Sequence, residues 1–351
     1  MLVNTPLAGA RGYSHMRRQI KVDGRAMNDK LVTLIGGGGF VGRYVAQALL
    51  ATGARVRIAQ RDPRQAFFLK PLGGLGQTQF VGADVTKPET IAHAIHGSDV
   101  VVTLVGVLAG DFQRVQALGA QTVAEAAAKA GVGALVHVSA IGADPQSASA
   151  YGKSKGQGEA AVLAAFPTAT ILRPSIVFGQ EDQFVNRFAG MIAKAPVVPV
   201  LRAPAKFQPV FVGNVADAIV AAASAPGTFG GQTLELGGPD IITMGGLIRW
   251  IASTIGRNPS IVELPDFAGA LIARAGFLPG APITKDQWTM LQSDNVVTGT
   301  DGLAAFGIEP TPLSTVAPGW LVRFRKAGRF GRRAATRAAT PTELLDGRRA
   351  G

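Results

Sequence analysis

Residues 31–42 read LVTLIGGGGFVG, in which five apolar or β-branched residues precede four glycines and the start of an apolar helical pattern. The glycines fit two registers, because either Gly36 or Gly37 can be the first glycine of the turn. In both registers Gly39 lets backbone N–H groups approach a pyrophosphate, and Gly42 lets the helix pack close to the strand. A strand, a glycine turn and a helix N-terminus in this order predict a dinucleotide-binding site. The residues expected to hold the pyrophosphate are Gly36, Gly37, Gly39, Phe40, Val41 and Gly42.

The chain around this turn alternates short apolar runs with alanine-rich helical patterns as far as Arg173. This alternation is typical of βαβ units, so we predict an α/β fold with a Rossmann-like, doubly wound parallel sheet. Strands are expected at residues 31–35, 55–59, 79–81, 100–105, 135–138 and 170–172, and helices at 41–51, 88–95, 113–130 and 148–166.

Beyond Pro174 the alternation stops, and proline and glycine become denser. We therefore expect a smaller C-terminal α+β lobe on the substrate side of the sheet. Its strands are expected near residues 209–212 and 233–236, and its helices near 214–223, 244–254 and 266–275. The predicted organisation is a basic extension over residues 1–28, a Rossmann domain over 29–173, the lobe over 174–325 and a basic, disordered tail over 326–351.

The end of the second predicted strand distinguishes the two nicotinamide dinucleotides. An acidic residue there would bind the ribose 2′-hydroxyl of NAD(H), but the sequence has Gln60 and Arg61. Arginine matches a 2′-phosphate in charge and geometry, so NADP(H) is favoured over NAD(H). The alternative is that Arg61 is an ordinary exposed arginine in a site that accepts both.

Further contacts with the nucleotide are expected where other strands end. Asp84 and Val85 are placed to touch the adenine, although Asp84 could equally be a helix cap before Lys87 and Pro88. The remaining expected contacts are Val105, Gly106 and Pro174, each at the end of a predicted strand.

Tyr151 and Lys155 form a YxxxK pattern at the start of a predicted helix, after the fifth strand. Their spacing places both side chains on one helix face. A free phenol titrates near pH 10, and an adjacent ammonium favours the phenolate, so the pair is suited to proton transfer. Ser139 ends the fifth strand, where its hydroxyl could polarise a substrate carbonyl. Alternatively, Tyr151 is an aromatic residue at a helix start, Lys155 is a solvated lysine, and Ser139 caps its own turn. Other candidates for the catalytic serine are Ser147, Ser149 and Ser154.

The net charge of +12 is concentrated at the two ends of the chain. Residues 1–30 carry +4 and residues 321–351 carry +7, which leaves +1 for the rest. Such ends suit an anionic membrane surface, an acidic partner or RNA, or simply keep the protein solvated. No basic–aromatic interleaving indicates nucleic-acid stacking, so no nucleic acid is expected. Met27, just before the first strand, is an alternative start.

The chain has no cysteine, which excludes disulfides and thiolate metal sites, and its four histidines lack metal-ligand spacing. No metal site is expected. No apolar run reaches the roughly 20 residues that span a bilayer. An apolar helical stretch near residues 265–279 could lie on a membrane or a partner, although core packing is the more common use of such a stretch.

Together, the glycine turn and the YxxxK pattern resemble the extended or atypical branch of the short-chain dehydrogenase/reductase superfamily. Within it, the chain looks like the nucleotide-binding accessory subunits of respiratory complex I and their alphaproteobacterial relatives, from about residue 28 to about residue 328. The stretches that carry this resemblance are FVGRYV (40–45), HVSAIGAD (137–144), ILRPSIVFG (171–179), FQPVFV (207–212) and DNVV (294–297).

The resemblance implies a tightly held, structural NADP(H) and a place near the quinone site of complex I. The subunit would lie peripherally, on the cytoplasmic face of a bacterial inner membrane or on the mitochondrial matrix side, with the basic ends free to touch anionic lipid. Tyr151, Lys155 and Ser139 would then be vestigial as catalytic residues, and the first two would hold the cofactor. Two departures stand out. Many relatives have aspartate at Asn214, and Ala140 and Ile141 occupy positions where extended members often place the active serine.

Three functions remain open on these grounds. The first is a non-catalytic NADP(H)-binding accessory subunit of complex I. The second is a free-standing NAD(P)-dependent reductase or epimerase-like enzyme that acts in quinone metabolism. The third is a nucleotide-sensing regulator.

Overall fold

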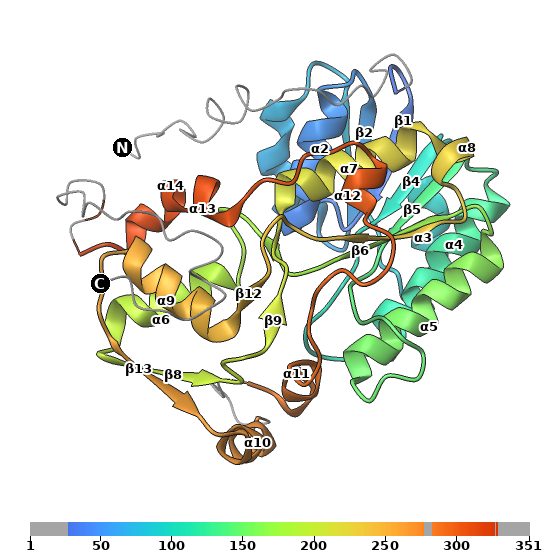
Figure 1. Ribbon diagram of the computed structural model, residues 1–351. Helices are drawn as coiled ribbons and strands as arrows, with labels where there is room; N and C mark the ends of the chain where they lie inside the picture. Colours follow the sequence, from blue (N-terminus) through green and yellow to red (C-terminus); the bar gives the residue numbers. More distant parts are fainter. Residues whose placement is uncertain (1–26, 277–282, 327, 329–351) are drawn as a thin grey trace.

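The computed structural model describes residues 27–276, 283–326 and 328. A seven-stranded sheet forms its centre, in the order β11-β6-β5-β4-β1-β2-β3, and every neighbouring pair of strands is parallel (Figure 1). The strand order reverses between β1 and β4, the position where sheets of this type bind ligands. The predicted Rossmann-like α/β fold is confirmed. The strands are β1 (Leu31–Ile35), β2 (Arg55–Gln60), β3 (Thr78–Gly82), β4 (Val100–Thr103), β5 (Ala134–Val138), β6 (Thr170–Pro174) and β11 (Thr233–Leu236).

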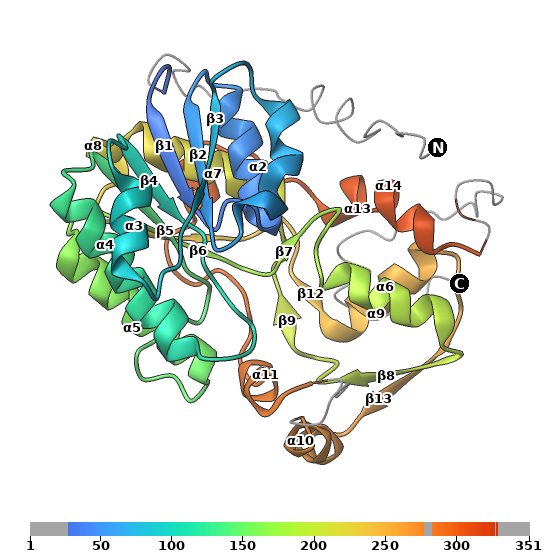
Figure 2. The same ribbon diagram turned by 180° about the vertical axis from the view of Figure 1, so that it is seen from behind.

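Helices cover both faces of this sheet (Figures 1 and 2). One face packs against α2 and α7, and the other packs against α3, α4 and α5. Leu34 belongs to the first core and Ile35 to the second, because successive side chains of a strand point to opposite faces. The helices are α2 (Phe40–Leu50), α3 (Pro88–Ile95), α4 (Gly119–Lys129), α5 (Ala150–Ala165) and α7 (Val212–Ser224).

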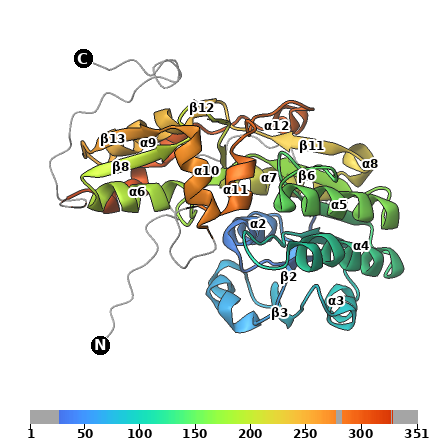
Figure 3. The ribbon, with the colours of Figure 1, turned by 90° about the horizontal axis from the view of Figure 1, so that it is seen from below.

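The C-terminal part of the chain forms a smaller lobe with its own hydrophobic core. Figure 3 shows this lobe beside the Rossmann part, with α10 and α11 between the two. Its two-stranded sheets pair β7 (Val177–Phe178) with β10 (Val210–Phe211), β9 (Lys206–Phe207) with β12 (Ile242–Thr243), and β8 (Val197–Leu201) with β13 (Ser260–Leu264). Its helices are α6 (Val185–Lys194), α9 (Met244–Thr254), α10 (Asp266–Arg274), α11 (Lys285–Met290), α13 (Leu313–Val316), α14 (Pro318–Leu321) and η3 (Val322–Phe324).

The central sheet draws one strand and one helix from beyond the predicted boundary at residues 173 and 174. β11 pairs with β6, and α7 packs on the same sheet face as α2. α8 (Pro226–Phe229) and α12 (Gly302–Ala305) lie next to these elements in the fold. The division into a Rossmann domain and a lobe therefore stays a prediction, since the sheet itself uses both parts of the sequence.

Three elements depart from the sequence-based expectation. The single helix expected over residues 113–130 begins as a π-helical segment, η2 (Gln113–Leu118), which then continues as α4. β4 ends at Thr103, two residues before the expected end. The Leu104 N–H still donates to the Ile35 carbonyl oxygen (2.9 Å), and Leu104 and Val105 then lie against Gly36 of the glycine turn. A 3₁₀ segment, η1 (Pro63–Leu72), follows β2 and was not expected.

The predictions for the basic extension (residues 1–28) and the basic, disordered tail (residues 326–351) lie mostly outside the residues that the structure describes. In the described part of the chain, no helix has both the length and the apolar character needed to cross a membrane. The same residues contain no group of three or more acidic or histidine side chains arranged to bind a metal ion.

Candidate dinucleotide site

The glycine turn joins β1 to α2 through a left-handed residue. Gly36 has φ +85°, and its N–H donates to the carbonyl oxygen of Ala59 (2.8 Å). Only glycine adopts this conformation without a steric penalty. A Cβ on Gly42 would overlap the carbonyl oxygen of Gly37, so glycine is required there for the helix to pack against the turn. Both proposed registers thus contain glycines with a steric role.

The N-terminus of α2 points out of this turn without a side-chain cap. Gly39 is the N-cap residue, and the first turn of α2 contains no acidic residue. The first N–H groups of a helix have no partner within it and carry a partial positive charge. The arrangement can therefore bind a pyrophosphate, with Phe40 and Val41 in the first turn.

Gln60 lies against the glycine turn at the end of β2. A Cβ on Gly38 would overlap the Gln60 side-chain oxygen, and the Gln60 Nε2 donates to the carbonyl oxygen of Asp62 (2.7 Å). Arg61 is exposed next to it. The carboxylate of Asp62 is bound by Arg64, with Nε to Oδ1 at 3.0 Å. The structure therefore brings Gln60 and Arg61 to the edge of the turn.

Asp84 is occupied by the turn that leads into α3. Its Oδ1 accepts from both the N–H and the hydroxyl of Thr86, each at 2.9 Å. The Thr86 N–H is the largest reason that the pKa of Asp84 is lowered, and the charge of Arg61 lowers it further. Val85 is buried in the core beside Gly119. Asp84 is not the helix cap that the alternative proposed, because Lys87 is the N-cap residue of α3 and no side chain caps that helix. Its carboxylate binds Thr86 in the preceding turn instead, and the adenine contact of Asp84 and Val85 stays a prediction.

Lys155 is buried beneath the segment that follows β4. Its Nζ donates to the carbonyl oxygens of Val138 (3.2 Å) and Val105 (3.5 Å). A Cβ on Gly106 would lie 3.5 Å from the same nitrogen. Burial lowers the pKa of Lys155 to about 8. The fold thus gathers three of the predicted contacts, Lys155, Val105 and Gly106, at the carboxyl end of the sheet.

Tyr151 lies in the first turn of α5, partly buried, with its ring edge-on to Phe112 at 6.0 Å between centroids. Burial raises the pKa of Tyr151 to about 12. The expectation that Lys155 would lower this pKa is not met, because the lysine ammonium bonds to backbone carbonyls instead of the phenol oxygen. In this state the tyrosine holds its proton at neutral pH.

Ser139 differs from the three other candidate serines because its buried hydroxyl has no hydrogen-bond partner among the described residues. Ser149 caps α5, Ser147 accepts from the Ser149 N–H (3.2 Å), and Ser154 donates to the Tyr151 carbonyl (2.9 Å). His137 stands two residues before Ser139 on the same strand, and both of its ring nitrogens are also unpartnered in the described part of the chain. Buried polar atoms normally have partners, so this corner of the site is suited to receive a polar ligand.

Gln116 is a site residue that the sequence analysis missed. Its Nε2 donates to the Ser154 hydroxyl (3.0 Å), and its Oε1 accepts from the Val107 N–H (3.3 Å). It links the π-helical segment to α5 and to the segment after β4. Segments of π-helix are often found at functional sites, but a sequence pattern does not separate one from an ordinary helix start.

A second missed feature is the ion pair between the partly exposed Arg173 of β6 and the buried Glu159 of α5, with Nε to Oε1 at 2.9 Å. This pair fixes α5 over the sheet. Pro174, the last residue of β6, accepts from the Ile141 N–H (3.0 Å), which ties it to the segment after β5. Asn214 accepts from the Thr311 N–H (2.8 Å), so its side-chain amide holds the chain at this point.

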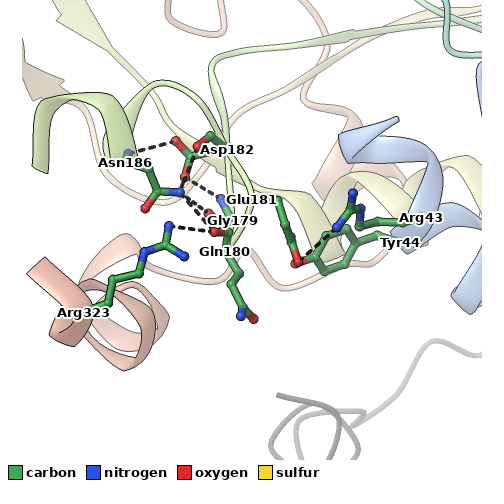
Figure 4. Close-up of polar contacts among 8 residues, drawn as sticks. All are labelled: Arg43, Tyr44, Gly179, Gln180, Glu181, Asp182, Asn186 and Arg323. Atoms are coloured by element: carbon green, nitrogen blue, oxygen red, sulfur yellow. Dashed lines mark hydrogen bonds and ion pairs between the residues drawn. The ribbon is translucent and has the colours of Figure 1, made fainter. Parts of the chain in front are cut away.

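The smaller lobe contacts the start of α2 through residues 179–182 (Figure 4). Glu181 accepts a hydrogen bond from the Tyr44 hydroxyl (2.7 Å) and pairs with Arg43 at 3.4 Å. Asp182 accepts from the N–H groups of the first turn of α6, and burial raises its pKa. Arg323 donates to the Gln180 carbonyl oxygen (3.2 Å). The two lobes therefore meet beside the helix that the glycine turn begins.

Comparisons with known proteins agree with this geometry. Residues 36–184 match the NAD(P)H-binding family, so the chain carries an NAD(P)H-binding domain. The chain is 34% identical over 293 residues to the mitochondrial NADH dehydrogenase [ubiquinone] 1 alpha subcomplex subunit 9 of Mus musculus, covering 81% of this chain and 77% of that protein.

Two further proteins are similar to this chain, one in sequence and one in structure. The ceramide reductase of Caulobacter vibrioides is 31% identical over 261 residues, which is 72% of this chain and 80% of the reductase. The NADPH-dependent quinone oxidoreductase of Escherichia coli, solved with NADPH, shares the fold with a TM-score of 0.66 at 19% identity, over 80% of this chain and 96% of that one. The identity and the coverage of the mouse protein establish that the chain belongs to the family of NADH dehydrogenase [ubiquinone] 1 alpha subcomplex subunit 9.

Proposed function

We propose that this protein is an NADP(H)-binding accessory subunit of respiratory complex I, in which the dinucleotide is a structural component. One observation carries the proposal: beside a glycine turn suited to a nucleotide, the Lys155 ammonium binds backbone carbonyls and not the Tyr151 phenol, so the pair is not arranged for proton transfer. Burial raises the pKa of Tyr151 to about 12, and the Lys155 ammonium is bound to backbone carbonyls. This arrangement supports nucleotide binding without the acid–base step that turnover requires.

The preference for NADP(H) over NAD(H) rests on the edge of the glycine turn. Gln60 lies where an acidic residue would bind a ribose 2′-hydroxyl, and Arg61 is exposed beside it. The nearest carboxylate along the chain, that of Asp62, is neutralised by Arg64. The local charge therefore favours a 2′-phosphate.

The partners proposed for the protein are the complex I subunits near the quinone site. The mouse relative, whose name places it in NADH dehydrogenase (ubiquinone), supports this assignment. The proposed location is peripheral, on the cytoplasmic face of a bacterial inner membrane or on the matrix side of a mitochondrial one. The basic residues concentrated at both ends of the sequence would add contacts with anionic lipid.

A reductase is the second candidate function. The ceramide reductase relative supports it, and so do the YxxxK pair and the unpartnered Ser139 hydroxyl. For this function the bound nucleotide and substrate would have to lower the pKa of Tyr151 and bring Lys155 to the ribose. The Tyr151→Phe variant would then lose turnover while it keeps NADPH binding.

One purification distinguishes the two functions. The protein is isolated from its own cells in mild detergent, and its partners and bound nucleotide are determined by mass spectrometry. The accessory function predicts complex I subunits and about one NADP(H) per chain that does not exchange with added nucleotide. Recovery of the chain alone, with NADPH oxidised by an added carbonyl or quinone substrate, would instead support the reductase.

A further inference from the structure

The first turn of α5 sets the position of two site residues, Tyr151 within it and Lys155 one turn later. The first N–H groups of a helix have no partners within the helix. Ser149 supplies part of the cap, since its hydroxyl accepts from the Gly152 N–H (3.2 Å). α5 contains no acidic residue in its own first turn, which leaves its positive end without a local counter-charge.

The counter-charge comes from the other lobe. The carboxylate of Asp286 in α11 accepts hydrogen bonds from the Ala150 N–H (2.6 Å), the Tyr151 N–H (3.2 Å) and the Ser149 hydroxyl (3.1 Å). Hydrogen bonds to a charged acceptor are about twice as strong as those between neutral groups. Asp286 therefore completes the cap of α5 from a position more than a hundred residues further along the chain.

Asp286 is held in place by its own surroundings. Thr284 and Gln287 form a capping box around it at the start of α11. α11 packs against α10, where a Cβ on Gly269 would overlap the Trp288 ring. Figure 3 shows this helix pair between the small lobe and the Rossmann part. A displacement of the pair would consequently move the carboxylate away from α5.

We propose that Asp286 is a positioning residue for the dinucleotide site, through which the α10–α11 pair sets the affinity for the nucleotide. The inference rests on the proposed NADP(H) binding. Without the carboxylate, the first turn of α5 opens part of the time and carries Tyr151 away from its place. The apparent affinity is then the intrinsic affinity multiplied by the fraction of molecules in which the turn is formed.

The test uses the full chain and its Asp286→Asn variant, titrated with NADPH by nucleotide fluorescence. We expect binding weaker than in the wild type by up to about tenfold, the limit set by losing one charge-assisted hydrogen bond from a turn of marginal stability. The Asp286→Glu variant keeps the charge and should recover binding to within about threefold. Asp301→Asn is the matched control, because Asp301 caps α12 in the same part of the chain through the Ala304 N–H (3.2 Å).

Hydrogen exchange of the Ala150 and Tyr151 amides without nucleotide gives a second, independent measurement. Asp286→Asn should accelerate exchange at these two amides, and Asp301→Asn should not. Wild-type affinity in Asp286→Asn, or unchanged exchange at the two amides, would overturn the inference. Failure of the wild type to bind NADPH would instead contradict the proposed function, and the exchange measurement would still decide whether Asp286 holds α5.

Discussion

His137 offers a direct test of how the site is buried. It is 2% exposed on β5, neither ring nitrogen has a partner among the described residues, and burial lowers its pKa to about 3, with a smaller contribution from the charge of Lys155. In the unfolded chain the pKa returns to about 6.5. The unfolded state therefore binds more protons between these two values, and stability must fall as the pH drops below about 6.5.

The magnitude follows from the two pKa values. At pH 7.5 both states are almost unprotonated at this residue, and the penalty is close to zero. At pH 4.5 the unfolded histidine is about 99% protonated and the folded one is mostly neutral, which costs about 3 kcal/mol. Because pH 4.5 lies above the folded-state pKa, this value depends mainly on the unfolded one.

The assay is urea unfolding of nucleotide-free wild type and His137→Leu at pH 7.5 and pH 4.5. Leucine is apolar and similar in size, so it fits a site where the imidazole makes no hydrogen bond. We expect the variant to match or exceed the wild type at pH 7.5. Between the two pH values it should lose about 3 kcal/mol less stability than the wild type. His93→Gln is the control, because His93 is exposed on α3. Equal losses in wild type and His137→Leu would refute the reasoning.

Three further predictions address the turn, the ion pair and the lysine. Gly42→Ala should cost about 1–3 kcal/mol in urea unfolding and weaken NADPH binding in a fluorescence titration, because the new Cβ would lie 2.6 Å from the Gly37 carbonyl carbon; unaltered binding would contradict the close packing. Glu159→Gln should cost about 1.5–3 kcal/mol in chemical denaturation, since it removes the charged hydrogen-bond acceptor of the partly exposed Arg173 guanidinium; a loss below 1 kcal/mol would mean that the pair contributes little to stability. Lys155 has its pKa lowered to about 8 by burial, so the unfolded state binds more protons between pH 8 and about 10.5. The wild type should thus gain about 2 kcal/mol relative to Lys155→Met between pH 7 and 9.5, and parallel pH profiles would show that the lysine is not buried as a cation.

Much of the nucleotide-binding half could be predicted because its signals are local. The residue types of residues 31–42 predict a strand, a turn and a helix, because the effect of each residue on the backbone extends over only a few positions. The predicted helix at 88–95 coincides with α3, where proline starts the helix and apolar residues recur at helical spacing. The site residues after each strand follow from the rule that parallel strands end at one edge of the sheet.

The interactions that the sequence could not predict join residues far apart in the chain. Asp286 and α5 are separated by more than a hundred residues, and so are Glu181 and Tyr44. β11 enters the sheet from a stretch with little alternation around it, because its place depends on an open edge at β6. Periodicity reports which face of an element is buried, but it carries no information about which distant side chain covers it.

By itself, the sequence determined the Rossmann-like sheet, the glycine turn and the residue types at the nucleotide edge, since backbone freedom at glycine and the alternation of apolar residues act locally. Only the tertiary structure decided the protonation behaviour of Tyr151 and Lys155, the bonds that Asp84 and Asp286 make, and the burial of the Ser139 hydroxyl without a partner among the described residues. A pKa depends on burial and on neighbouring charges, and a hydrogen bond depends on which groups the folded chain brings within about 3 Å.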